Sequence, residues 1–424
     1  MTIFGCVWIL LLLFCFPKKE NMIALTIISS TIQCSNVFVF GTIGIGPQII
    51  TSLVFIIRIL IIKAKLRVKF STDDWGIIRC LLIVFGVSVA SSIYNNNISD
   101  SAVRLVQLFV YIMCAFCMGY IANIMTHDKV YKMVRKLTIW MIVFGFVQLI
   151  FSSGVFPKLW LFDELFFNEK GQYVYYHSNG GYRRILGSYM EPSYYAGFVV
   201  GAFYYFLPIK NKRKENWLIM FFLGIQMILS FASSAYGAFV IVGFLFFLFT
   251  REKAFKWKSF FVAIVGFALI YIFFYRVLDQ VVFSKISMEN DSYRVRYWSD
   301  MMALDAFKKS PIIGNGYKTV RGSSIIYTIL GELGIIGLVA YIIMNGNIIV
   351  KNYICKTKKC VNDYVLAVSL AMMASVAIQI LAVPDIDICT YWMWLDIMML
   401  HLMITVKSRG KAYEGVIQSN KKQI

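Results

Sequence analysis

The sequence predicts an all-α, polytopic integral membrane protein with about 12 or 13 transmembrane helices and two long extracytoplasmic loops. Composition is the first observation behind this fold class, because 59% of the 424 residues are hydrophobic and only 15% are charged. The mean hydropathy is +0.70. Soluble domains carry far more charge. The sequence has no stretch typical of a soluble catalytic domain, so residues 1–424 are predicted to form a single transmembrane domain.

The second observation is a series of apolar runs that are mostly long enough to cross about 30 Å of hydrocarbon. The predicted spans are residues 3–16, 21–40, 46–62, 76–93, 103–125, 133–153, 189–207, 215–232, 234–250, 257–276, 324–349, 362–382 and 388–406. The first run is short, but no lysine or arginine precedes it and no small-residue cleavage site follows it. We therefore expect a retained helix there and not a signal peptide.

Lysine and arginine concentrate in every second connection between these runs, as is typical of the cytoplasmic side of membrane proteins. The basic clusters lie at residues 18–19, 63–69, 129–136, 210–214, 251–258, 351–359 and 407–422. This alternation predicts an N-terminus outside the membrane and a C-terminus in the cytoplasm. Together with anionic lipid headgroups it also explains the net charge of +20, so that no nucleic-acid partner is expected.

Two of the outward connections are long, residues 154–188 and 277–322. Long loops in compact proteins are usually functional or disordered. The first loop is rich in aromatic residues, which argues against disorder. Two interpretations of its aromatic residues stay open, a belt at the level of the lipid headgroups and a surface on which sugars stack.

The outward side uses arginine where the inner clusters mostly use lysine. Four of the outer arginines lie in the long loops as two close pairs, Arg183 with Arg184 and Arg294 with Arg296. Guanidinium groups fork onto phosphate oxygens, so paired arginines suit the capture of a pyrophosphate. The plainer alternative is that they form salt bridges with neighbouring carboxylates. Those carboxylates are Glu191, Asp291 and Asp300.

Five short motifs in and around these loops resemble those of a known family. They read RILGSYMEPSYYAGF at 184–198, SSAYGAF at 233–239, DSYRVRYW at 291–298, SPIIGNGY at 310–317 and LGELGIIG at 330–337. Their order and spacing are similar to those of O-antigen polymerases and ligases, and the match looks like the Wzy type of bacterial polysaccharide polymerase. The resemblance covers about residues 180–345, and the predicted topology agrees with it over the full length.

The resemblance implies a metal-independent glycosyltransferase without a cofactor, related in fold to the C-type lipid-linked glycosyltransferases. Its substrate would be an undecaprenyl-diphosphate-linked oligosaccharide at the outer face of the bacterial cytoplasmic membrane. Membrane lipids, a flippase and a chain-length-regulating copolymerase are the implied partners. The family's functional arginines fall on Arg184 and Arg294, with Arg183 and Arg296 as neighbours. They would hold the diphosphate leaving group and neutralise its developing charge.

One position departs from the family pattern and leaves the general base open. Many relatives, the ligases especially, carry a histidine where this chain has Ser323, followed by Ser324. Glu191 is the first candidate base, because partial desolvation near a membrane interface raises the pKa of a carboxyl group, although nearby arginines act the other way. Asp291 comes second. The other residues assigned to substrate contact or catalysis are Tyr194, Tyr195, His177 and Glu332.

An alternative role for Glu191 follows from the residue after it. Pro192 is predicted to start a helix, where its missing N–H costs nothing. Glu191 would then lie beside the positive end of that helix and act only as a cap and an arginine partner. Two further functions also stay open: a ligase that passes finished polymer to another acceptor, and a flippase for lipid-linked oligosaccharides. Flippases usually place charges at mid-membrane and use broken helices.

The remaining motifs predict structure rather than chemistry. Cys114 and Cys117 have redox spacing but lie inside an apolar run, where cysteine is usually a small hydrophobe. The nine cysteines and three histidines show no metal-type pairing, so no metal site is expected. Gly197 and Gly201 are expected to let a neighbouring helix approach closely. Asp396, within the last run, predicts an inward-facing polar contact.

Overall fold

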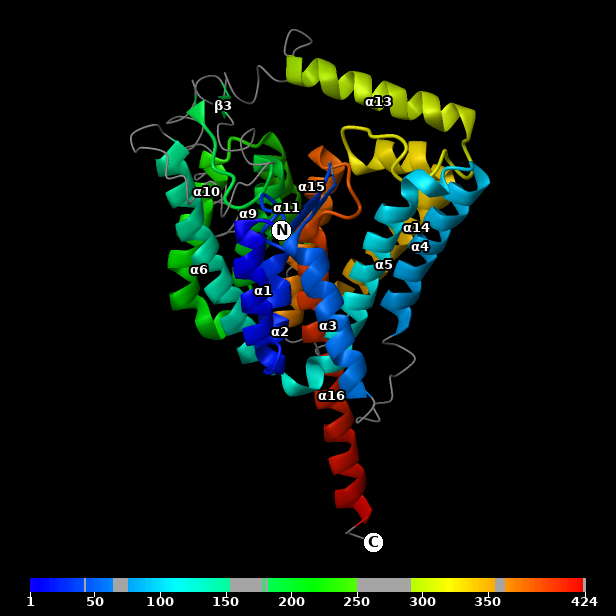
Figure 1. Cartoon of the computed structure of the whole chain (residues 1–424). Helices are drawn as coiled ribbons and strands as arrows, with labels where there is room; N and C mark the ends of the chain where they lie inside the picture. The colour runs from blue at the N-terminus through cyan, green and yellow to red at the C-terminus, as the bar shows by residue number, and fades with distance from the viewer. Residues whose placement is uncertain are drawn as a thin grey trace.

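The computed structural model describes residues 1–41, 43–63, 75–152, 178–179, 182–249, 291–354 and 363–421, and most of them are helical (Figure 1). The α-helices are α1 (Ile3–Cys15), α2 (Lys19–Ser29), α3 (Pro47–Lys63), α4 (Trp75–Tyr94), α5 (Ile98–Ile121), α6 (His127–Ser152), α9 (Pro192–Phe206), α10 (Arg213–Leu229), α11 (Ser233–Phe249), α13 (Asp291–Lys309), α14 (Ile325–Ile354), α15 (Asp363–Ala382) and α16 (Cys389–Lys421). The 3-10 helices are η1 (Ala122–Ile124) and η2 (Lys210–Lys212). Strand β1 (Phe38–Phe40) pairs antiparallel with β2 (Ile43–Ile45), and β3 (Ser178–Asn179) with β4 (Tyr182–Arg183).

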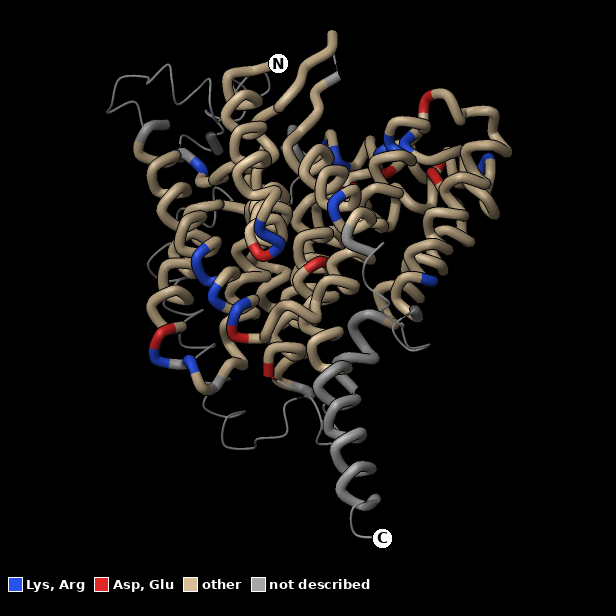
Figure 2. Tube along the Cα trace, turned by 60° about the horizontal axis from the view of Figure 1, so that its bottom comes forward, with Lys and Arg blue, Asp and Glu red and all other residues tan. Residues whose placement is uncertain are grey.

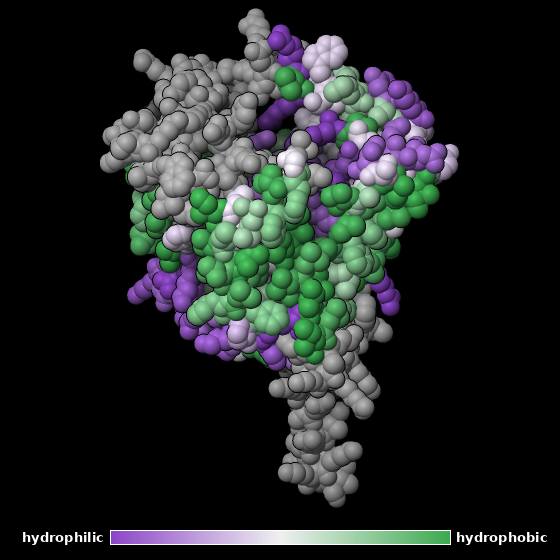
Figure 3. Space-filling view, viewed as in Figure 1, coloured by the Kyte–Doolittle hydropathy of each residue, from purple (hydrophilic) through white to green (hydrophobic). Residues whose placement is uncertain are grey.

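Six helices in the described part of the chain are long and apolar enough to cross a membrane. They are α4, α5, α6, α14, α15 and α16. The shorter helices α1, α3 and α11 are also apolar. On the face shown in Figure 3, hydrophobic residues form a broad band across the middle, with hydrophilic residues above and below it. The fold is therefore all-α with a multi-pass membrane architecture, as the sequence predicted.

The helix boundaries correct one of the predicted spans, and another predicted span lies outside the described residues. The run 21–40 is not one helix, because α2 ends at Ser29. The Ser29 hydroxyl donates to the Thr26 carbonyl at 2.7 Å, and the N–H groups of Gln33 and Cys34 both donate to the Ser188 carbonyl. The chain then forms β1, so these apolar residues fold into an irregular turn and a hairpin. The predicted span 257–276 lies outside the described residues.

The second long loop, 277–322, is also corrected, because its residues from Asp291 to Lys309 form helix α13. This helix lies across one end of the bundle (Figure 1). We call that end the upper end, and it gathers residues 30–46, 95–97, 184–191, 310–324 and 383–388. The first loop falls mostly on residues 153–177, which are outside the described part of the chain.

The opposite, lower end holds three of the basic clusters. Lys129 contacts Glu20 there at 2.7 Å, and Arg135 contacts Glu215 at 3.3 Å, which ties the N-terminal part of α6 to the first turns of α2 and α10. In Figure 2, where this end is turned toward the viewer, charged residues gather mainly in one group at the lower left and another at the upper right. The clusters at 18–19, 129–136 and 210–214 share the lower end, whereas Arg184, Arg294 and Arg296 belong to segments at the upper end.

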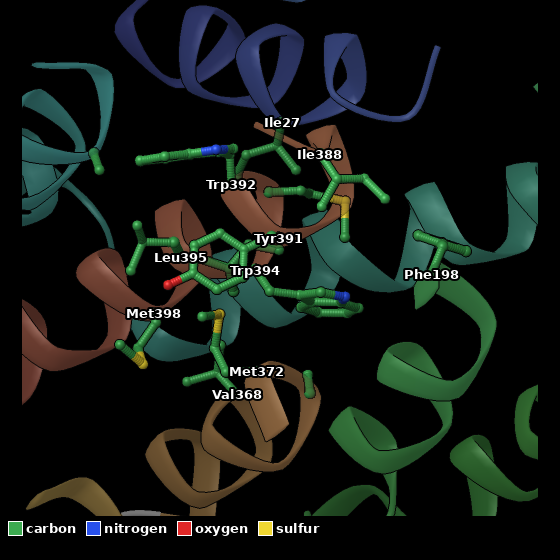
Figure 4. Packing of buried hydrophobic residues seen from close by; sticks show 14 of the residues in the cluster. Ile27, Phe198, Val368, Met372, Ile388, Tyr391, Trp392, Trp394, Leu395 and Met398 are labelled. Carbon is green, nitrogen blue, oxygen red and sulfur yellow. The ribbon is translucent and has the colours of Figure 1, made fainter. Parts of the chain in front are cut away.

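The centre of the bundle is made by α9, α15 and α16. Figure 4 shows Tyr391, Trp392 and Trp394 packed among Met372 and Phe198. On α9, a Cβ added at Gly201 would press against the indole of Trp394, which confirms the predicted close helix approach. Asp396 of α16 faces inward, as predicted, and accepts a hydrogen bond from the Cys114 thiol at 3.8 Å.

Helix α14 is broken at Gly334, where φ is +64° and ψ is −162°. The break leaves backbone N–H and C=O groups without partners inside the helix, and the preceding segment 310–317 forms hydrogen bonds with them. The Glu332 carbonyl accepts from the Gly316 N–H at 2.9 Å, and the Ile335 N–H donates to the Pro311 carbonyl at 2.9 Å. The motifs SPIIGNGY and LGELGIIG are therefore two halves of one packed unit, which fixes the turn at 318–321 above it.

Replacing Gly314 by alanine is expected to lower the free energy of unfolding by about 2 kcal/mol or more. Gly314 has φ +79°, and an added Cβ would overlap the backbone of Glu332. The matched control is Gly86→Ala, because a Cβ at Gly86 meets nothing within 4 Å and alanine favours a helix. Thermal unfolding of both variants in the same detergent measures the difference. Equal melting temperatures would contradict the tight packing of the two motifs.

Candidate functional site

A buried lysine between two aspartates lies at the upper end. Lys318 Nζ is 2.6 Å from Asp385 Oδ1 and 2.8 Å from Asp387 Oδ1. Lys318 belongs to the turn before α14, with φ +63°, and the aspartates lie between α15 and α16. Burial lowers the pKa of the Lys318 ammonium, but Asp387 and Asp385 outweigh it and raise the pKa above its ordinary value. The three groups form a charged ion-pair network.

Arg321 joins this network from the same turn. Its Nη2 donates to the hydroxyl of Tyr194 at 3.1 Å and to Asp385 Oδ2 at 3.3 Å. The Tyr194 hydroxyl in turn donates to Asp385 Oδ2 at 3.2 Å. The Arg321 side chain is 63% exposed, so its guanidinium can meet a ligand without moving. Tyr194, assigned from the sequence to substrate contact, therefore lies inside the charged cluster.

Glu191 lies next to this cluster at the start of α9. It occupies the N-cap position with Pro192 at the first helical position, as predicted. Its carboxylate accepts a hydrogen bond from the Ser193 hydroxyl at 3.1 Å. The protein itself leaves the side chain exposed, so the partial desolvation expected at a membrane interface stays a prediction. Its negative charge acts on both Arg184 and Arg321.

Arg184 interacts with Glu191 and also hydrogen-bonds to the backbone. Its Nε donates to the Ser230 carbonyl at 2.9 Å and its Nη2 to the Phe231 carbonyl at 3.1 Å, at the end of α10. These bonds use two of the five N–H groups of the guanidinium. Burial lowers the pKa of Arg184 to about 10, with Glu191 acting to raise it and Arg296 to lower it. The side chain is therefore charged at neutral pH.

The second arginine pair is on α13. Arg294 and Arg296 are both exposed, and the positive charge of Arg296 acts on Arg184. Arg184 belongs to one of the arginine pairs predicted from separate loops, and Arg296 belongs to the other. Their interaction indicates that the two pairs are near each other. The side chains of Arg183 and Asp291, and the whole of His177, lie outside the described residues, so their predicted roles stay predictions.

The sequence alternative supposed that Asp300 pairs with an arginine, but no such pair is present in the described part of the chain. Its Oδ1 accepts from the Ser323 N–H at 2.7 Å and its Oδ2 from the Ser323 hydroxyl at 2.8 Å. This clamp fastens α13 to the start of α14. Ser323 thus holds a helix in place. The neighbouring Ser324 is buried.

Two other sequence candidates are buried near the site. Glu332 is 2% exposed, and its carboxylate lies beside the backbone and the ammonium of Lys318. Tyr195 points into the core, where its hydroxyl donates to Gln226 Oε1 at 2.5 Å. Glu332 therefore supports the lysine network from below, and Tyr195 positions α9. Neither lies on the exposed side of the cluster.

The sequence analysis did not single out Lys318, Asp385 or Asp387. A usable signal was present, because the short segment VPDIDI at 383–388 puts two aspartates between the last two apolar runs. Carboxylates at the edge of a membrane span are costly unless they are paired. Their partner could not be named from the sequence, since Lys318 and Asp385 are 67 residues apart.

Most charges of this arrangement are paired within the protein. Lys318 contacts Asp385 and Asp387, Arg321 contacts Asp385, and the charge of Glu191 acts on Arg184 and Arg321. The exposed cations beside Glu191 are Arg321 and Arg296. Such a site suits a polyanion such as a diphosphate, with one carboxylate to contact a hydroxyl group. In the described part of the chain, no group of three His, Cys, Asp or Glu side chains is placed to hold a metal ion.

Comparisons with known proteins add no family to this geometry. No protein-family model matches the chain. A search of curated proteins finds no match either. The function is therefore argued from the motifs and from the side chains that they bring together at the upper end of the bundle.

Proposed function

We propose that this chain is a metal-independent glycosyltransferase that polymerises undecaprenyl-diphosphate-linked oligosaccharides into a surface polysaccharide. The observation that carries the proposal is that Arg184 and Arg296, which come from two separate motifs, interact electrostatically. Glu191 interacts in the same way with Arg184 and with Arg321, which lies in the turn before α14. This is the charge pattern that a diphosphate leaving group requires. The order of the motifs, similar to that of Wzy-type polymerases, supports the same conclusion.

The reaction is a displacement at the anomeric carbon of the growing chain. The acceptor hydroxyl oxygen forms the new bond to that carbon, and the bond from the carbon to the diphosphate oxygen breaks. The diphosphate leaves with the electron pair and is held by Arg321 and its neighbours. Glu191 accepts the hydroxyl proton, since its carboxylate is exposed at the edge of the cluster. Direct displacement inverts the anomeric configuration.

The upper end is assigned to the outer face of the bacterial cytoplasmic membrane. The lower end holds the lysine-rich clusters at 18–19, 129–136 and 210–214, and such clusters favour the cytoplasm. The N-terminus is then outside and the C-terminus inside. Lipid-linked repeat units reach an outward site only after a flippase has moved them, and a copolymerase that limits chain length is a further partner.

A ligase is less well supported than a polymerase. The ligases of the family carry a histidine at the position of Ser323, and here that serine is bound to Asp300. A flippase is the competing function, because the break of α14 at Gly334 is a feature of transporters. However, residues 311–316 take up the freed backbone groups, so this break packs against protein. That packing favours the enzyme.

The test is to incubate purified protein with chelator and with lipid-linked repeat units isolated from cells that lack the gene. We expect a ladder of polymer on a gel from the wild type, and none from Arg321→Ala. The matched control is Arg104→Ala, which changes an exposed arginine of α5 that donates to Gln107 at 3.1 Å. We expect this control to keep the ladder. If the wild type forms no ladder while labelled lipid crosses a vesicle bilayer, the chain is a flippase.

A further inference from the structure

A cavity of about 490 Å³ lies under the second half of α13. Its lining includes the polar residues Asn97, Asp305, Lys309 and Thr319 and the apolar residues Met302 and Val320. The turn at 318–321 separates it from the charged cluster. Lys318 and Arg321 reach Asp385 on one side, whereas Thr319 and Val320 line the cavity on the other. The volume is within the range of about 300–1,000 Å³ that small-molecule sites have.

An exposed stripe of α13 leads into this cavity. Val295, Trp298 and Met302 are spaced as on one face of a helix, and they are 65%, 59% and 61% exposed. Met302 also lines the cavity, so the stripe and the cavity are continuous. An adjacent face of α13 packs on the bundle through Ala303, which is fully buried. Hydrophilic and apolar residues are mixed at this end of the molecule in Figure 3.

The lining favours one class of ligand. A carboxylate, an ammonium, an amide and a hydroxyl group donate to and accept from the hydroxyl groups of a neutral ligand. The lining holds one acid, Asp305, which pairs with Lys308 at 2.9 Å, and one base, Lys309, and it lacks the pair of guanidinium groups that suits a phosphate. The Trp298 ring offers a flat apolar surface with one polar N–H. A pyranose ring combines hydroxyl groups at its edge with an apolar face of C–H bonds, and therefore matches both parts.

We propose that the cavity and the Val295–Trp298–Met302 stripe form a glycan-binding subsite, separate from the charged cluster, which holds a sugar of the acceptor strand outside the reacting residue. Its role in acceptor binding rests on the proposed polymerase function, but the binding of a glycan does not. Because Thr319 and Val320 share a turn with Lys318 and Arg321, a sugar held here lies one turn of chain away from the diphosphate site.

The test uses the full chain in lipid nanodiscs and an array of bacterial O-antigen and capsular oligosaccharides without lipid or phosphate. The oligosaccharide that binds best is then titrated against the variants Trp298→Ala and Val320→Trp. The first removes the stacking surface, and the second fills the cavity. Trp217→Ala is the matched control, because Trp217 on α10 is 60% exposed. We expect at least about tenfold weaker binding for the two site variants and no change for the control.

The outcomes separate this inference from the proposed function. A wild type that binds no oligosaccharide on the array, or equal affinity in all three variants, overturns the subsite even if the polymer ladder forms. Weaker binding in both site variants supports it even if no ladder forms. Size-exclusion profiles identify a variant that does not fold. If the larger side chain at Val320 is not tolerated, Trp298→Ala alone decides the test. This variant only shortens an exposed side chain.

Discussion

Replacing Lys318 by alanine is expected to lower the free energy of unfolding by about 3 kcal/mol or more. The side chains of Asp385 and Asp387 are 21% and 7% exposed. Without the ammonium, Asp385 keeps the contact with Arg321, but the nearly buried carboxylate of Asp387 loses its ion pair with Lys318. Breaking a buried ion pair by removing one partner is far more damaging than replacing the whole pair. The measurement is thermal unfolding in detergent at neutral pH, with the fraction of folded protein followed by size exclusion.

A control and a rescue make this expectation specific. Lys308→Ala removes an ion pair of 2.9 Å with Asp305, but the two side chains are 74% and 65% exposed, so we expect a loss of about 1 kcal/mol or less. Changing Asp385 and Asp387 to asparagine in the Lys318→Ala background is expected to restore most of the stability. An unchanged melting temperature in Lys318→Ala would mean that water reaches both aspartates freely.

The helices could be predicted from the sequence because each apolar run is a continuous signal. Hydropathy does not separate a helix from an apolar turn, however, and this is why the run 21–40 was predicted as one span. Ile32 and Val37 are apolar residues after the end of α2. Helix α13 was missed for the opposite reason. Its sequence DSYRVRYWSDMMALDAFKK mixes charged and apolar residues, so a search for continuous apolar runs passes over it.

The candidate site could be predicted only in part. Arg184, Glu191, Tyr194 and Arg296 were assigned because they lie in motifs that can be read locally. The Lys318 network depends on a contact between two connections that are far apart in the sequence, and no local pattern encodes such a pairing. The clamp between Ser323 and Asp300 is of the same kind. Tertiary contacts therefore decide which of the charged residues at the upper end are held by partners and which face a ligand.

Replacing Arg321 by alanine is expected to lower the rate constant of chain extension by about 100-fold or more, which is the usual effect of removing one group that stabilises transition-state charge. The Arg321 side chain is 63% exposed, and its guanidinium also donates a hydrogen bond to the Tyr194 hydroxyl at 3.1 Å. Its loss leaves the leaving diphosphate with fewer donors. The measurement is single-turnover extension of a lipid-linked acceptor, which separates the chemical step from binding.

Arg321→Lys distinguishes bidentate recognition from charge alone. Lysine keeps the charge but cannot hold the Tyr194 hydroxyl and two phosphate oxygens at once, so we expect it to recover little of the lost rate. Stability is expected to change by about 1 kcal/mol or less in both variants, because the side chain is mostly exposed. If lysine restores the full rate, a point charge is sufficient at this position. Should alanine keep the full rate, the leaving diphosphate must be held by Arg184 and Arg296 instead, and Arg321 then serves only to position Tyr194.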